Sequence, residues 1–190
     1  MKMKKISFAL LGALLALASA PAADAQVFSP TFQAPYMSND VGLYISDFED
    51  ELGIEGILRR GMGSFDLGLR LGLVEDAVLL GIDTRNPLAV AGTAPLALAL
   101  TLGGQAALGD ENVFGAQVGL SIGHAFRTPG ATITPYIHPR AALLFGGDEE
   151  DFEALADVGV DVALRPNFIL RFGANLAEGA DFGIGLALRR

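Results

Sequence analysis

The residues that could do chemistry lie in stretches where large apolar residues alternate with small or polar ones. The polar members of the second row are Asp66, Arg70, Asp83, Gln117, Tyr136, His138, Arg140, Asp157, Asp161 and Arg171. If this row faces an interior, its charges need partners, because an unpaired buried charge is costly. We expect Arg70, Arg140 and Arg171 to pair with aspartates of the same row. The sequence therefore predicts a salt-bridge network that fills the interior.

Two sharper interpretations use the same residues. The charges could line a narrow polar pore that a small solute crosses or binds in. Catalysis would need a nucleophile, a base and a carboxylate in contact. His138 and Ser121 share the inward row, but no motif places a carboxylate beside them, so the sequence predicts no enzyme. With no Cys and only two His residues, zinc-type ligand spacing is missing, and we expect no metal and no cofactor.

Residues 65–74, FDLGLRLGLV, show the alternation most clearly. Phe and four Leu residues form one row, while Asp, Gly, Arg and Val form the other, and a period of two is typical of a β-strand. The sequence predicts ten strands, at residues 41–47, 52–60, 64–74, 77–84, 94–103, 112–126, 131–145, 153–165, 167–176 and 180–189. If residues 46–60 form a short amphipathic helix instead, eight strands remain.

The turns between these predicted strands segregate charge. Every odd-numbered turn is acidic, and together these turns hold 15 of the 21 acidic residues that follow position 25. The even-numbered turns and the last two residues hold seven of the ten arginines. Alternate turns of an up-and-down sheet lie at opposite ends, so ten strands give one acidic end and one Arg-rich end. A wrong count would mix the charges, and the segregation therefore favours ten strands over eight.

The first 25 residues are typical of a secretory signal peptide. Three lysines precede a short apolar segment, and Ala-Asp-Ala at 23–25 is a small-x-small cleavage sequence. We expect residues 1–25 to be removed, residues 26–40 to form an extended periplasmic lead-in, and residues 41–190 to form a β-barrel.

The remaining chain is acidic and free of lysine. Ten arginines stand against 21 acidic residues, a net charge of −11, which argues against nucleic-acid binding. No further run of 18 apolar residues follows the signal peptide, so a transmembrane helix is excluded. High hydropathy without such a helix leaves a very apolar soluble domain or a membrane β-barrel.

The composition of the two rows decides which one faces outward. A soluble sheet would bury the leucines and expose rows of glycine with few charges, which is a poor surface for water. A membrane barrel is apolar outside and small or polar inside, and its closure pairs every backbone polar group. Phe residues at strand ends could form its aromatic girdle: Phe48, Phe65, Phe114, Phe126, Phe145, Phe168 and Phe182. The small inward residues leave free volume that water or residues 26–40 could fill.

Together, the signal peptide, the alternating Gly/Leu strands, the charged turns and the closing FGIGLALRR resemble a small bacterial outer-membrane β-barrel protein. The resemblance covers nearly all of the chain after the signal peptide. It implies an all-β, up-and-down antiparallel transmembrane β-barrel in the outer membrane, reached after cleavage near Ala25. It also implies outer-membrane lipids as partners, periplasmic Arg-rich turns and acidic loops outside. Such proteins usually end on an aromatic residue, where this chain has Arg190.

Three functions remain open from the sequence. The first is a monomeric barrel with a mostly structural, salt-bridged lumen, and the second is a narrow small-solute channel or binding barrel. The third is a surface interaction protein that acts through its acidic loops, although short loops argue against it. Residues 147–153, GDEEDFE, lack the order of a calcium-binding loop, so divalent cations are only a weak alternative to a solvated loop.

Overall fold

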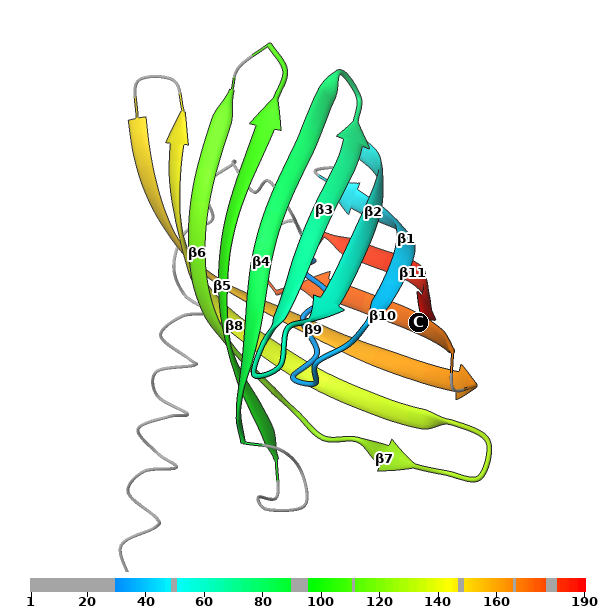
Figure 1. The fold of residues 1–190 in the computed structure, drawn as a ribbon. Coiled ribbons are helices and arrows are strands. Elements are labelled where there is room, and N and C mark those ends of the chain that lie inside the picture. The colour runs from blue at the N-terminus through cyan, green and yellow to red at the C-terminus, as the bar shows by residue number, and fades with distance from the viewer. Residues whose placement is uncertain are drawn as a thin grey trace, which may run out of the picture.

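In the residues that the structure describes, the chain forms a closed antiparallel barrel of ten long strands and one short one (Figure 1). This computed structural model describes residues 30–48, 51–89, 96–110, 112–146, 149–165, 167–176 and 181–190. The strands are β1 (Asp40–Phe48), β2 (Glu51–Gly61), β3 (Asp66–Val74), β4 (Ala77–Ala89), β5 (Ala97–Leu108), β6 (Val113–Gly123), β7 (Phe126–Arg127), β8 (Thr132–Gly146), β9 (Glu149–Arg165), β10 (Phe168–Asn175) and β11 (Phe182–Arg189).

Every long strand pairs with two neighbours, so the sheet has no free long edge. Strands that follow one another pair in order, and the ring closes where β1 pairs with β11 and β6 pairs with β8. The short β7 only pairs with the start of β8. The predicted fold class is confirmed, and ten strands rather than eight form the barrel, because β1 pairs with β2 along its whole length.

Several strand boundaries differ from the predicted ones because cross-strand pairing continues past the turn signals. β4 runs on to Ala89 and pairs with β5, which begins and ends later than expected. Pro87 lies where the register of that pairing shifts, a position at which its missing N–H is tolerated. β9 begins earlier than expected, because its pairing with β8 extends to Gly146 and Glu149.

The leucine row of β3 faces outward, as the sequence predicts. Leu69, Leu71 and Leu73 are 47%, 57% and 59% exposed, whereas Asp66 and Arg70 on the opposite face are 0% and 5% exposed. The same alternation of exposed apolar and buried small or polar residues runs along β11, and along β2 except at the buried Ile57. The barrel is therefore apolar outside and polar inside, the arrangement that a lipid bilayer requires.

Phenylalanine is exposed near both ends of the apolar exterior. Phe114 of β6 and Phe145 of β8 are register partners near the acidic end and are both exposed. Phe126 is exposed at the Arg-rich end. No helix in the described part of the chain is long and apolar enough to cross a membrane.

Glycines of the inward row make room for large side chains on the neighbouring strand. Gly185 of β11 is the register partner of Tyr44, and a Cβ atom on it would lie only 1.9 Å from the Tyr44 ring. Gly159 of β9 stands opposite Tyr136 in the same way, with 2.3 Å to the ring. At these two positions the inward row carries glycine because a tyrosine ring occupies the space that a side chain would need.

This packing predicts a site-specific cost for the smallest possible enlargement. We expect Gly185→Ala to lower the free energy of unfolding by about 1–3 kcal/mol, because the new methyl group displaces the Tyr44 ring. Gly56→Ala is the matched control, since the nearest atom to a Cβ there is 3.9 Å away. Urea unfolding of the barrel in lipid, followed by gel mobility, measures both. Equal losses in the two variants would contradict the packing described.

Candidate functional site

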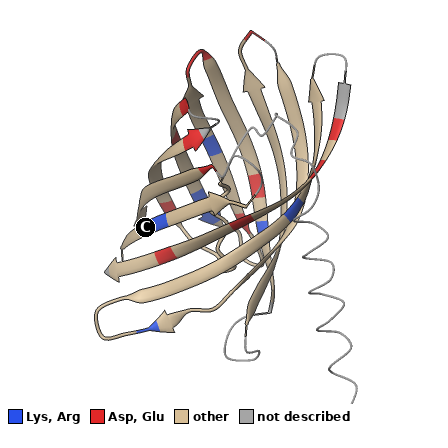
Figure 2. Cartoon of the chain, turned by 180° about the vertical axis from the view of Figure 1, so that it is seen from behind, with Lys and Arg blue, Asp and Glu red and all other residues tan. Residues whose placement is uncertain are grey.

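In the described part of the chain, five arginines point into the lumen, and each is bound to at least one acidic side chain. None of these arginines is more than 5% exposed. The ion pairs are Arg59–Asp66 (2.9 Å), Arg59–Asp83 (2.6 Å), Arg70–Glu55 (2.6 Å), Arg85–Asp66 (2.5 Å), Arg140–Asp157 (3.3 Å), Arg171–Asp40 (2.6 Å) and Arg171–Asp161 (3.2 Å). In Figure 2 blue and red segments occur along the strands, away from the red loop tips at one end. The lumen thus contains a network of paired charges.

Asp66 is the centre of the network on β2, β3 and β4. One of its carboxylate oxygens accepts from Arg59 Nη1, and the other accepts from both Nε and Nη2 of Arg85. Arg59 uses its second terminal nitrogen to reach Asp83. The strand register creates the contact between Asp66 and Arg85, because these two residues lie directly opposite each other on β3 and β4. Removing the Asp66 carboxylate would leave two buried guanidinium groups without one of their partners.

Four members of the network are missing from the residues that the sequence predicts. Arg59 and Arg85 are predicted to belong to the Arg-rich turns, whereas both lie within strands and point inward. Glu55, which binds Arg70, and Asp40 are missing from the predicted set. The alternation along β2 could have identified two of these residues. Ile54 and Leu58 face outward, so Glu55 and Arg59, which follow them directly, belong to the inward row.

The predicted residues on β6, β8, β9 and β10 all lie on the inward face. Arg140 binds Asp157 and also donates to the Gln117 side chain at 3.0 Å. Arg171 binds Asp161, holds both oxygens of Asp40 and donates to the Tyr44 hydroxyl at 2.6 Å. Tyr136 acts differently: its ring covers Gly159, and its hydroxyl makes no hydrogen bond within the described chain.

The chain before β1 enters the lumen. The sequence predicts an extended periplasmic lead-in over 26–40, but residues 30–35 are buried inside the barrel, where the small residues of the wall leave room. We call residues 30–38 the plug segment; residues 26–29 lie outside the described chain. Its backbone carbonyls accept hydrogen bonds from the wall: Pro30 and Thr31 from Arg70, Gln33 from Ser121, and Ala34 from Arg85.

Side chains of the plug segment add further contacts. Gln33 donates to Asp83 at 2.8 Å, which joins the segment to the Asp66 cluster. Phe32 packs on the Tyr44 ring with 4.6 Å between the ring centroids. Phe32 also has a backbone φ of 52°, a left-handed conformation that is unfavourable for a residue with a side chain. The contacts around the buried ring hold this conformation in place.

The Thr31 hydroxyl, the His138 imidazole and the Asp157 carboxylate lie close together. His138 Nε2 lies 2.8 Å from Thr101 Oγ1, and its Nδ1 lies 2.8 Å from Thr31 Oγ1 and 3.5 Å from Asp157 Oδ2. The order resembles the relay of serine hydrolases. However, Thr31 itself bonds to Asp157, and the whole group is at most 5% exposed, so no space remains for a substrate. Its geometry suits an anchor for the plug segment.

Other chemistry of the lumen is limited. Ser121, which shares the inward row with His138, donates to the Gln33 carbonyl instead. Within the described ranges, no three His, Cys, Asp or Glu residues are grouped so that they could hold a metal ion.

The geometry can be compared with solved structures. The β domain of the Bordetella autotransporter BrkA superposes with a TM-score of 0.57 at 11% identity, over 80% of this chain and 97% of that one. The chain has the fold of a small outer-membrane β-barrel protein. This barrel also matches the KdgM porin (TM-score 0.44, 6% identity, 80% and 99% of the two chains) and LpxR from Salmonella typhimurium (0.46, 6%, 80% and 100%). Neither a protein-family model nor a curated protein matches the sequence.

The central place of Asp66 predicts a large effect for a small substitution. We expect Asp66→Asn to cost about 3 kcal/mol or more of the free energy of unfolding, because Arg59 and Arg85 remain buried with a weakened partner. Asp76→Asn, in the exposed β3–β4 turn, should change it by less than about 0.5 kcal/mol. Urea titration in lipid vesicles compares the two. A loss at Asp66 no larger than at Asp76 would show that the cluster does not stabilise the barrel.

Proposed function

We propose that this protein is an outer-membrane barrel with a structural, closed lumen. The observation that carries the proposal is the plug segment, whose carbonyls are held by two arginines and a serine of the wall. A conducting pore keeps its charged side chains available to water and passing ions. Here the buried arginines are committed to carboxylates and to the plug segment, which supports a passive role over transport.

Apolar side chains support closure at the acidic end of the lumen. Leu79, Leu144 and Leu155 point inward from β4, β8 and β9 and are at most 5% exposed. Leu79 packs with Val74 and Val113 in a small apolar cluster. Buried apolar side chains disfavour the passage of water and ions. The lumen therefore combines inward leucines near the acidic end with the paired charges and the plug segment.

The proposal includes where the protein resides. Export by a signal peptide, with cleavage near Ala25, would deliver the chain to the periplasm, and the apolar exterior would then take outer-membrane lipids as its partners. The Arg-rich end would face the periplasm and the acidic end the cell exterior. Each long strand already pairs with two others of the same chain, which supports a monomer. The acidic loops could bind divalent cations weakly.

A narrow channel is the second candidate, and one observation favours it. The plug segment is joined to the barrel covalently through β1, but elsewhere the described contacts are hydrogen bonds and packing contacts that can break without unfolding the strands. Space beside the segment is also open at the Arg-rich end, where a cavity of about 550 Å³ is lined by Met37, Ser38, Gly61 and Arg190 among others. A channel would open if the segment left the lumen.

Single-channel recording in planar bilayers separates the two functions. We expect the intact barrel to give no discrete current steps, because the plug segment and the inward leucines close the lumen. A variant that lacks residues 30–38 should give steps of defined size, provided that heat-dependent gel mobility shows it folded. Steps from the intact protein would support the channel instead. A folded deletion variant without steps would show that the plug segment is not the seal.

A further inference from the structure

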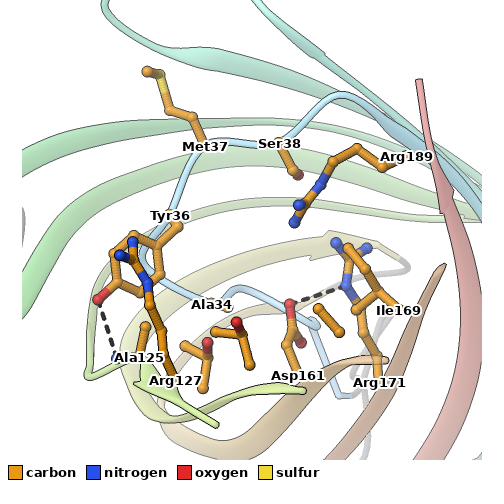
Figure 3. Close-up of a pocket in the computed structure, with 13 residues that line it drawn as sticks. Ala34, Tyr36, Met37, Ser38, Ala125, Arg127, Asp161, Ile169, Arg171 and Arg189 are labelled. Carbon is orange, nitrogen blue, oxygen red and sulfur yellow. Dashed lines mark hydrogen bonds and ion pairs between the residues drawn. The ribbon is translucent and has the colours of Figure 1, made fainter. Parts of the chain in front are cut away.

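A second cavity, of about 280 Å³, lies between the plug segment and the wall near the Arg-rich end. Figure 3 shows Tyr36 and Arg127 on one side of the cavity, Asp161 and Arg171 on the other, and Ser38 above them. Its volume is close to that of small-molecule sites in proteins. The cavity is lined by charged groups of both signs, and two of them have unused bonding capacity.

The positive group with unused capacity is Arg127. It is exposed in β7, and its guanidinium group makes no hydrogen bond or ion pair with another residue that the structure describes. Arg189 of β11 lines the cavity as well. A guanidinium group binds a carboxylate through two parallel hydrogen bonds. This side of the cavity therefore suits a carboxylate.

The negative group with unused capacity is Asp161 of β9. Its Oδ2 atom accepts from Arg171 at 3.2 Å, whereas its Oδ1 atom is buried and accepts no hydrogen bond in the described chain. A buried acceptor without a donor carries a desolvation cost of about 1–3 kcal/mol. Arg171 cannot supply that donor readily, because its terminal nitrogens are bound to Asp40 and Tyr44. A ligand with its own donor would satisfy Oδ1.

The strand register places these two groups at a suitable separation. Arg127 pairs with Thr132 of β8, and Asp161 pairs with Thr134 two residues further along the same strand. Two strand spacings and two residue steps put the Cα atoms of Arg127 and Asp161 roughly 12 Å apart. Thr132 and Thr134 line the cavity between them. This separation leaves room for a small bifunctional molecule between the two side chains.

We propose that this cavity binds a small carboxylate that also carries a hydrogen-bond donor, such as an amino acid or a hydroxy acid. The carboxylate binds Arg127, and the ammonium or hydroxyl group donates to Asp161 Oδ1. The site rests on the proposed closed lumen, because the plug segment supplies Ala34, Tyr36 and Ser38 to the cavity. The proposed site goes beyond the closed lumen, because it assigns a ligand to the cavity at the Arg-rich end.

Four molecules of similar shape test the proposal on the intact protein in micelles. L-Alanine and L-lactate keep both groups, propionate lacks the donor, and alaninamide lacks the carboxylate. Titration is followed by NMR of the threonine methyl groups, which include Thr132 and Thr134. We expect millimolar binding of alanine and lactate, at least about tenfold weaker binding of propionate, and no binding of alaninamide.

Two variants assign the contacts, and a third is the control. Asp161→Asn should remove most of the preference for alanine over propionate, while Arg127→Gln should weaken alanine, lactate and propionate alike. Arg60→Gln removes an exposed arginine at the same end that does not line the cavity, and should change nothing. Equal binding of alanine and propionate, or no binding of any molecule, would overturn the proposal. If the intact barrel is silent in bilayers but binds nothing, the site fails while the closed lumen stands.

Discussion

The pairing of charges inside the barrel is the interaction on which the rest of the structure depends. A closed sheet with an apolar exterior has only its lumen in which to place polar side chains, and a buried charge is tolerated there only with a partner. Asp66 binds Arg59 and Arg85 from the strands on either side, and so ties three strands together through side chains as well as backbone. The same arginine that binds Asp66 from β4 also holds the carbonyl of Ala34. Strand pairing, lumen charge and plug segment are therefore one connected arrangement.

The alternation of glycine with leucine follows from this arrangement. Outward positions need large apolar side chains for lipid, whereas inward positions must leave space for arginine, tyrosine and the plug segment. Glycine provides that space: Tyr44 lies over Gly185, and Phe32 and Pro30 lie against Gly183. A lumen lined by larger residues would have no room for a segment of chain. The inward row of glycines with few charges, which would be a poor surface for water, therefore suits an interior that is filled by side chains and the plug segment.

The sequence alone predicts the barrel well, because period two and the charge of the turns both depend on local order. These signals give ten strands, the outward leucines and the lumen positions of Arg140 and Asp157. They do not give the exact ends of strands, which depend on pairing with a neighbour, and for that reason they place Arg59 and Arg85 in turns. They also leave two possible fillings for the lumen, water or residues 26–40. Residues 26–40 show no periodic pattern, so the sequence does not indicate which strands they would contact. The hydrogen bonds of Thr31 and Gln33 are therefore visible only in the structure.

The central claim is that the chain before β1 closes the lumen as an ordered part of the barrel. Amide hydrogen exchange of residues 30–35, measured on the full barrel in lipid nanodiscs, tests this claim most directly. The backbone N–H of Thr31 donates to Asp157 inside the lumen, and residues 30–35 are buried. The account predicts exchange at Thr31 that is slowed to the range of the neighbouring strands. Exchange as fast as that of an unstructured peptide would contradict it.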